Sequence, residues 1–153
     1  MRPELRLPAE GAMAEAPRTL VLDTNIVLDL LLFAEPDAGA VRLLLAAQRL
    51  HWIATQAMRD ELACVLRYAH LQPRMAFHGR TAEDVLAAFD AGARLVAEAP
   101  RAPCVCKDAD DQKFIDLAAA HGAVLVSKDK AVLRLRRRLE AAGALVVAAV
   151  ALD

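Results

Sequence analysis

The sequence predicts an α/β fold: a three-layer sandwich with helices on both faces of a central, mostly parallel sheet of four or five strands. Short, continuous apolar runs alternate along the chain with longer segments in which apolar residues recur at three- and four-residue steps. Continuous runs are typical of parallel strands buried on both faces, and the longer segments are typical of amphipathic helices. Their alternation indicates strand–helix–strand units.

The first half of the chain is expected to hold two strands and three helices. Glu35-Pro36 should stop the first helix, because the residue before a proline disfavours helical geometry. Thr55 is a favourable N-cap residue for the third helix. In order, the expected elements are a strand at 19–22, a helix at 26–33, a helix at about 41–48, a strand at 51–54, and a helix that starts after Thr55 and ends at Gln72-Pro73.

The second half continues the alternation. Thr81 and Asp84 have the spacing of a capping box, and Gly122 suits the residue just past a helix end. Cys104 and Cys106 are expected as half-buried thiols on a short strand. The other expected elements are a loop at 75–80, a helix at 81–93, a strand at 95–97, a helix from the acids at 108–111 to Gly122, a strand at 123–126, one helix around 132–139 and a strand at 145–150.

The length and composition of the chain indicate one globular domain, which we place at residues 19–153. Hydrophobic residues make up 57% and charged residues 25% of the 153 residues, as in ordinary globular proteins. Residues 1–18 carry charges of both signs without an apolar core, so we expect a disordered leader rather than a signal peptide. No apolar run approaches the ~20 residues of a membrane span, and three cysteines do not suit a secreted disulfide scaffold. We therefore expect a cytoplasmic protein without a membrane partner.

Acidic side chains follow separate strands at one edge of the predicted sheet. Asp23 comes directly after the first strand, and Asp129 follows the strand at 123–126. The carboxyl ends of parallel strands meet at the same edge, where ligands bind in open sheets. The acids from Asp108 to Asp111 open a helix that leads into that later strand, and Glu61 lies about two turns into the helix after the second strand. The sequence thus predicts that these carboxylates converge.

Carboxylates that lie close together favour the binding of a cation. Two bare charges 4 Å apart repel by about 4 kcal/mol at an effective dielectric of 20, and such groups raise one another's pKa values. An all-oxygen set without paired histidine or cysteine favours Mg²⁺ or Mn²⁺ over Zn²⁺. Each acid also has a simpler interpretation: the aspartates could cap the helices that follow them, and Glu61 could be a solvated helix charge.

The motifs that carry these acids resemble those of the PIN-domain family of metal-dependent nucleases. They are Leu22-Asp23-Thr24-Asn25, Glu61-Leu62, the segment from Asp108 to Phe114, and Ser127-Lys128-Asp129-Lys130. Within the family, the Asp-x-Asp-Asp-x-Lys-Phe segment from Asp108 to Phe114 most resembles that of putative toxin components of toxin–antitoxin pairs. The resemblance covers the chain from about Thr19 to its end.

The resemblance implies an endoribonuclease that hydrolyses RNA phosphodiesters. Asp23, Glu61, Asp111 and Asp129 would be catalytic and would hold one or two Mg²⁺ or Mn²⁺ ions. Asp108 is a helix cap, an outer ligand or the true third carboxylate in place of Asp111. Three residues would support the site, namely Thr24, Asn25 and Ser127. The implied partners are RNA, an antitoxin protein and a second copy of the chain, paired through the apolar segments 26–33 and 41–45.

Basic side chains offer a local path for nucleic acid, although the net charge of the chain is −1. Arg134, Arg137 and Arg138 fall on one helical face, which is either a patch for RNA phosphates or a solvated face. Lys113, Lys128 and Lys130 lie nearer the acids. With one tryptophan and one tyrosine, we expect no strong platform for stacking single-stranded bases. The four histidines are expected to be structural or surface residues.

Three other functions fit parts of the pattern. A receiver-like phospho-acceptor domain would need paired acids after the first strand, where Asp23 stands alone. A haloacid-dehalogenase-like phosphatase would need an acid at Asn25. A non-catalytic module that binds RNA or an antitoxin would keep the fold without turnover, and metal binding without cleavage would identify it.

Overall fold

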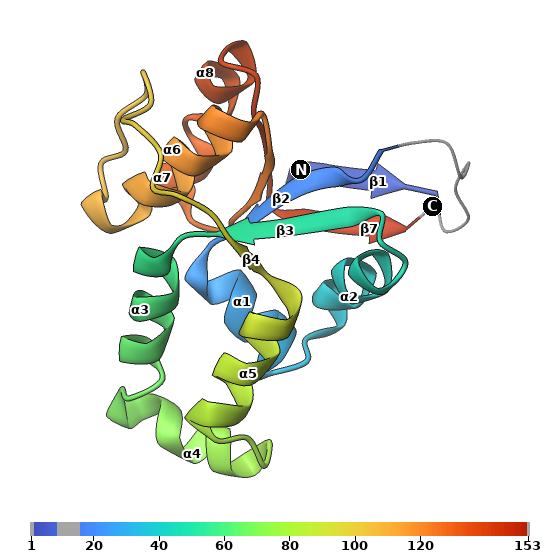
Figure 1. Cartoon of the computed structure of the whole chain (residues 1–153), viewed down its shortest axis with the longest axis vertical. Helices are drawn as coiled ribbons and strands as arrows, with labels where there is room; N and C mark the ends of the chain where they lie inside the picture. The colour runs from blue at the N-terminus through green and yellow to red at the C-terminus, as the bar shows by residue number, and fades with distance from the viewer. Residues whose placement is uncertain (1, 9–15, 153) are drawn as a thin grey trace.

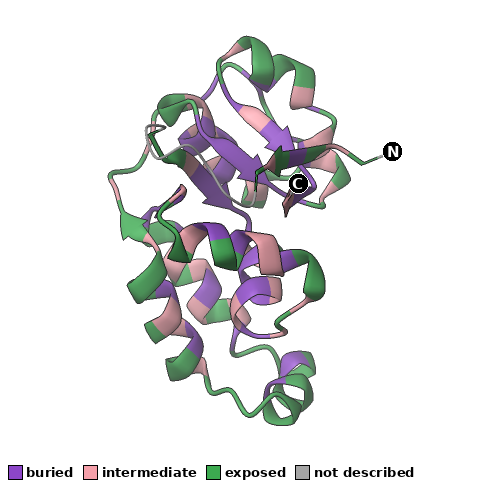
Figure 2. Cartoon of the chain, turned by 90° about the vertical axis from the view of Figure 1, so that its right-hand side faces the viewer, coloured by how far each residue is buried: buried purple, intermediate pink, exposed green. Residues whose placement is uncertain are grey.

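A computed structural model describes residues 2–8 and 16–152. Its centre is a five-stranded parallel sheet with the strand order β4-β3-β2-β5-β6, and helices cover both faces (Figure 1). The predicted three-layer α/β fold is therefore confirmed. In Figure 2 the buried residues concentrate in the strands of the sheet and on the helix faces that pack against them.

The strands of the central sheet are short and apolar. Leu20, Val21 and Leu125 are fully buried, as expected for strands covered on both faces. β2 and β5 are neighbours although about a hundred residues separate them, and Leu22 pairs with Val126 at their carboxyl ends. The five strands are β2 (Arg18–Leu22), β3 (Leu50–Ala54), β4 (Arg94–Leu95), β5 (Val124–Val126) and β6 (Leu145–Val147).

One face of the sheet is covered by helices from the first two thirds of the chain (Figure 1). α1 contacts α2, α3 and α5, and α2 packs on β3. The predicted capping box of α5 is present, since Thr81 and Asp84 each accept a backbone hydrogen bond from the other. The helices on this side are α1 (Thr24–Leu31), α2 (Gly39–Ala46), α3 (Gln56–Val65), α4 (Gln72–Phe77) and α5 (Ala82–Gly92), with 3₁₀ turns η1 (Pro36–Ala38) and η2 (Ala69–Leu71).

The other face carries the helices that follow the acidic segment. α6 packs on β2 and β5, and α7 and α8 pack on β6. Gly122 ends α6 in the left-handed conformation with φ 58°, as predicted for a C-terminal glycine. The elements are η3 (Ala109–Asp111), α6 (Gln112–His121), α7 (Lys130–Leu133) and α8 (Arg136–Ala141).

The N-terminal segment differs from the expected disordered leader. Residues 4–7 form strand β1 (Glu4–Leu7), which pairs in parallel with β7 (Ala149–Leu152) in a separate two-stranded sheet. Leu5 is buried there. The expected final strand at 145–150 is two strands, because the chain passes from one sheet to the other at Ala148, whose N–H donates to the carbonyl of Pro3 at 2.8 Å. The rest of the expected leader includes residues 1 and 9–15, which lie outside the described residues.

Two helix predictions were wrong in detail. Residues 72–77 form α4, where the sequence suggested a helix end and a loop. Pro73 lies in the first turn of this helix, where a missing N–H costs nothing. The single helix expected around 132–139 is broken into α7 and α8 at Leu135. Leu135 at the break and Leu139 in α8 are both buried in the core, with 8% and 0% exposure.

The segment before the acids also differs from expectation. Cys104 and Cys106 are buried, but neither belongs to a strand. The buried Gln112 side chain takes the place of a strand partner: its Oε1 accepts from the Cys106 N–H at 2.7 Å, and its Nε2 donates to the Cys104 carbonyl at 2.9 Å. All three cysteines of the chain are free.

Two further expectations concern surfaces. The apolar side chains of α1 and α2 lie mostly in the core of the chain itself, and Leu43 is the one large apolar side chain of these two helices that is fully exposed in the structure, at 59%. Across residues 2–8 and 16–152, none of the helices has the length and apolar character needed to cross a membrane.

Candidate functional site

Asp23 lies where β2 ends, next to the end of β5. Its backbone N–H donates to the Val126 carbonyl at 3.2 Å, which places its side chain beside Ser127. The carboxylate Oδ1 accepts the Ile26 N–H at 2.9 Å and so caps α1. The simple interpretation of Asp23 as a helix cap is therefore correct. Asp23 is only 4% exposed.

Burial makes Asp23 hard to ionise. The pKa of Asp23 is raised to about 6, mainly by desolvation and to a smaller extent by the charges of Asp129 and Asp29. Hydrogen bonds from the Ser127 hydroxyl and the Ile26 N–H act in the opposite direction. Because desolvation exceeds these hydrogen bonds, a positive charge near Asp23 would stabilise its ionised form.

Three more carboxylates converge in front of the sheet edge. One oxygen from each of Asp108, Asp111 and Asp129 lies within 4.8 Å of the others. Asp108 caps η3 by accepting the Asp110 N–H at 3.0 Å, and Asp129 caps α7 by accepting the Ala131 N–H at 2.8 Å. We call Asp108, Asp111 and Asp129 the acidic triplet. The sequence left a choice between Asp108 and Asp111, but the fold brings both together.

Asp111 is the member of the acidic triplet whose carboxylate is least well paired. Its Oδ2 atom is buried and has no hydrogen-bond partner among the described residues. Its pKa is raised to about 7, mainly by burial and in addition by contact with Asp129 and by the charges of Asp129, Asp108 and Asp23. Two carboxylates in such contact require either a shared proton or a cation between them. The acidic surroundings of Asp111 therefore favour a bound cation, and the described residues place no hydrogen-bond donor on its Oδ2 atom.

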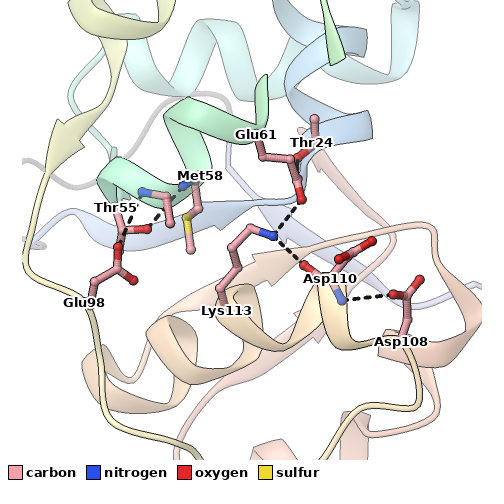
Figure 3. Close-up of polar contacts among 9 residues, drawn as sticks. Thr24, Thr55, Met58, Glu61, Glu98, Asp108, Asp110 and Lys113 are labelled. Atoms are coloured by element: carbon pink, nitrogen blue, oxygen red, sulfur yellow. Dashed lines mark hydrogen bonds and ion pairs between the residues drawn. The ribbon is translucent and has the colours of Figure 1, made fainter. Parts of the chain in front are cut away.

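Glu61 is placed from the opposite side of the site by α3 (Figure 3). Its Oε2 accepts a short hydrogen bond from the Thr24 hydroxyl, and its Oε1 pairs with Lys113 Nζ at 2.6 Å. The same Nζ donates to the Asp110 carbonyl at 2.5 Å. Lys113, predicted as a contact for nucleic acid, therefore links α3 to the start of α6. Glu61 stands outside the acidic triplet but faces the same pocket.

The predicted acidic residues line one pocket. Asp23, Glu61, Asp111 and Asp129 all line it, together with Asp108. Thr24 and Asn25 also line it, whereas Ser127 is fully buried beneath, between Asp23 and the Asp129 N–H. An all-oxygen donor set with an unpartnered buried carboxylate oxygen fits a hard divalent cation such as Mg²⁺ or Mn²⁺. The residues present therefore fit the predicted metal.

The predicted basic contacts fall into two groups. Lys113 lies at the acids, where it pairs with Glu61, and Lys128 pairs with Asp29 at 3.1 Å. Arg134, Arg137 and Arg138 are exposed, and among the described residues none of the predicted basic contacts, Lys130 included, lines the pocket itself. Their part in binding nucleic acid stays a prediction.

Sequence reasoning missed several residues near the acids. Gln112 anchors the loop that precedes Asp108, and its polar character beside a run of aspartates was the one available signal. Pocket-lining side chains just past the end of α1, at the start of η2 and in α4 were also missed, because no short motif brings them together. These are Phe33, Tyr68, His70 and Arg74.

Comparison with known families agrees with this arrangement. The family model described as the PIN domain matches residues 19–131. This match covers the predicted motifs from Asp23 to Asp129. A search of curated proteins finds no match to the chain.

Proposed function

The chain belongs to the PIN domain family, and on this premise we propose that it is a metal-dependent endoribonuclease that hydrolyses RNA phosphodiesters. PIN domains are generally nucleases, so a nuclease-type module is the broad assignment. RNA as substrate, the identity of the cation and the role of each residue are the finer parts of the proposal.

The buried Oδ2 atom of Asp111 is the observation that carries the proposal. Asp111 lies beside Asp108 and Asp129 in the acidic triplet, and its Oδ2 atom lacks a hydrogen-bond donor among the described residues. A purely structural aspartate would normally be paired. Asp111 and Asp129 would hold one or two Mg²⁺ or Mn²⁺ ions together with Asp23 and Glu61, and Asp108 would be a further or outer ligand.

Each side chain has a defined part in the proposed reaction. A bound divalent cation would supply a more acidic water and would stabilise charge on a phosphoryl oxygen. Ser127 and the start of α1 hold Asp23 in place, while Thr24 and Lys113 hold Glu61 across the pocket. Water adds to phosphorus as the bond to the 3′-oxygen breaks, and that oxygen takes a proton. The products are a 3′-hydroxyl and a 5′-phosphate.

Cleavage assays on purified protein test this mechanism. Wild-type protein with Mn²⁺ should cut a mixed RNA, whereas EDTA or the Asp23→Asn substitution should abolish cutting. Asp60→Asn is the matched control, because Asp60 neighbours Glu61 but is exposed and does not line the pocket. Equal cleavage under all conditions would disprove the mechanism. Mn²⁺ binding without any cleavage would instead indicate a non-catalytic module that binds RNA or an antitoxin.

We further propose that the protein is the toxin of a toxin–antitoxin pair. The segment from Asp108 to Phe114, with its Asp-x-Asp-Asp-x-Lys-Phe pattern, supports this assignment. Induced expression in a bacterial host should arrest growth, and the Asp111→Asn variant should not. Growth arrest by both proteins at equal protein levels would contradict a toxin that acts through RNA cleavage. A homodimer stays a prediction, to be checked by sedimentation.

A further inference from the structure

The pocket that contains the acids continues along two helices, away from the sheet. α1 begins at Thr24 beside the acids, Leu28 lines the pocket one turn later, and Phe33 lines it just past the helix end. The eight residues of α1 extend about 12 Å at 1.5 Å per residue. Figure 1 shows α1 and α3 leaving the same edge of the sheet and α4 at their far end. The pocket is therefore a groove with one acidic end and one end near α4.

The end near α4 carries aromatic and cationic side chains. The guanidinium carbon of Arg74 lies 3.7 Å from the ring centroid of Phe33. The rings of Tyr68 and His70 lie 5.6 Å apart and are inclined by 36°. All four side chains line the groove, and we call them the aromatic wall. Tyr68 is 50% exposed, so part of its ring is open to a ligand.

We infer that the aromatic wall binds an unpaired nucleotide of a single-stranded nucleic acid, next to the phosphodiester that lies at the acids. The inference rests on the proposed nuclease function and adds to it a stacking subsite, which the low aromatic content of the sequence did not predict. Every nucleobase has a face that can stack on an aromatic ring, and such stacking tolerates any sequence. A base in a duplex is already stacked and cannot reach Tyr68 without being displaced.

Charge explains why such a subsite is needed. Six carboxylates line the groove, namely Asp23, Glu61, Asp108, Asp110, Asp111 and Asp129. Lys113 pairs with Glu61, and the other carboxylates repel a phosphate chain wherever no cation offsets them. Arg74 is the one lysine or arginine among the described lining residues, so it is the side chain placed to hold a phosphate beyond the acids. Stacking on Phe33 keeps its guanidinium plane within the groove.

Binding of fluorescein-labelled hexauridylate, followed by fluorescence anisotropy in EDTA, tests the inference without any cleavage. Tyr68→Ala should weaken binding about tenfold, which equals about 1.4 kcal/mol and lies within the range for stacking one base. Tyr68→Phe should bind as wild type does. Tyr68→Leu, which keeps apolar area but lacks a ring, serves as a second variant if Tyr68→Ala does not fold.

Arg74→Ala should weaken binding and reduce the slope of log K against log salt by about 0.7, the value for one phosphate contact on a single strand. Two exposed neighbours outside the groove provide matched controls: Phe77→Ala for the aromatic ring and Arg67→Ala for the charge. Both should bind hexauridylate normally. A 12-base-pair RNA duplex should bind more weakly than hexauridylate, and Tyr68→Ala should not change its affinity.

The inference is overturned if wild type does not bind hexauridylate, if Tyr68→Ala and Tyr68→Leu bind as wild type does, or if Phe77→Ala loses as much affinity as they do. None of these outcomes tests the proposed chemistry. That chemistry is tested by the loss of cleavage in Asp23→Asn. Conversely, intact cleavage by Asp23→Asn would disprove the proposed chemistry and leave the binding result as it stands.

Discussion

Replacing Asp23 with asparagine should stabilise the metal-free protein, and the gain should grow with pH. The carboxyl group is 4% exposed, and its pKa is raised from 3.8 to about 6, mainly by desolvation. Asparagine keeps an oxygen that can accept the Ile26 N–H but carries no charge. The folded protein binds the Asp23 proton more tightly than the unfolded chain does, so this contribution to stability is full below pH 4 and is lost as the pH rises through 6.

The size of the gain follows from the pKa difference. Each unit is worth 1.36 kcal/mol, so the gain in free energy of unfolding should increase from about 1 kcal/mol at pH 4.5 to about 3 kcal/mol at pH 8. Urea unfolding in EDTA measures it, with the fluorescence of the one tryptophan, Trp52, as the signal. Trp52 is 2% exposed in the folded protein, so unfolding should change its emission strongly.

Asp60→Asn is again the control, since the exposed Asp60 carboxylate should give no pH-dependent gain. A loss of stability in Asp23→Asn at pH 8, or an equal gain at both pH values, would refute the reasoning. The first result would mean that the hydrogen bonds to the charged carboxylate outweigh its desolvation. The second would mean that Asp23 has an ordinary pKa in the folded protein.

Three further outcomes are expected. Mn²⁺ at 100 times its Kd should add about 2.7 kcal/mol to the stability of the wild type, and thermal unfolding should show little of this gain in Asp111→Asn. Thr81→Ala should lower the free energy of unfolding by about 1 kcal/mol through loss of the α5 capping box; urea unfolding at two salt concentrations should give the same loss. Gln112→Ala should leave backbone groups of the Cys104–Cys106 loop unpaired, so a thiol reagent should label Cys106 faster than in the wild type, and unchanged labelling would contradict this role.

Much of the acidic site could be predicted from the sequence because it depends on strand direction. A parallel strand places the residue after its end at a known edge of the sheet. Asp23 and Asp129 follow two such strands, and the register that pairs Leu22 with Val126 brings them together. Glu61 could be placed on the correct side by helical periodicity alone. Its pairing with Lys113 could not, because that contact joins helices 52 residues apart in the chain.

Short elements were the ones that the sequence predicted wrongly. Strand β1 has four residues, of which Leu5 alone is buried, and its pairing partner β7 lies at the other end of the chain. Such a segment has too little local pattern to distinguish strand from coil. α4 has six residues, fewer than an isolated helix needs to form in water. Its stability comes from packing, with Met75 buried in the core.

The sequence by itself determined the alternating strands and helices, the parallel sheet and the edge at which the carboxylates meet, since these follow from local periodicity and strand direction. Only the tertiary structure decided which carboxylate oxygens approach one another and that the Oδ2 of Asp111 is left without a partner. Only the packing of α1, α3 and α4 made one groove from Phe33, Tyr68 and Arg74. These features depend on contacts between distant segments, which helix packing sets and local sequence patterns do not encode.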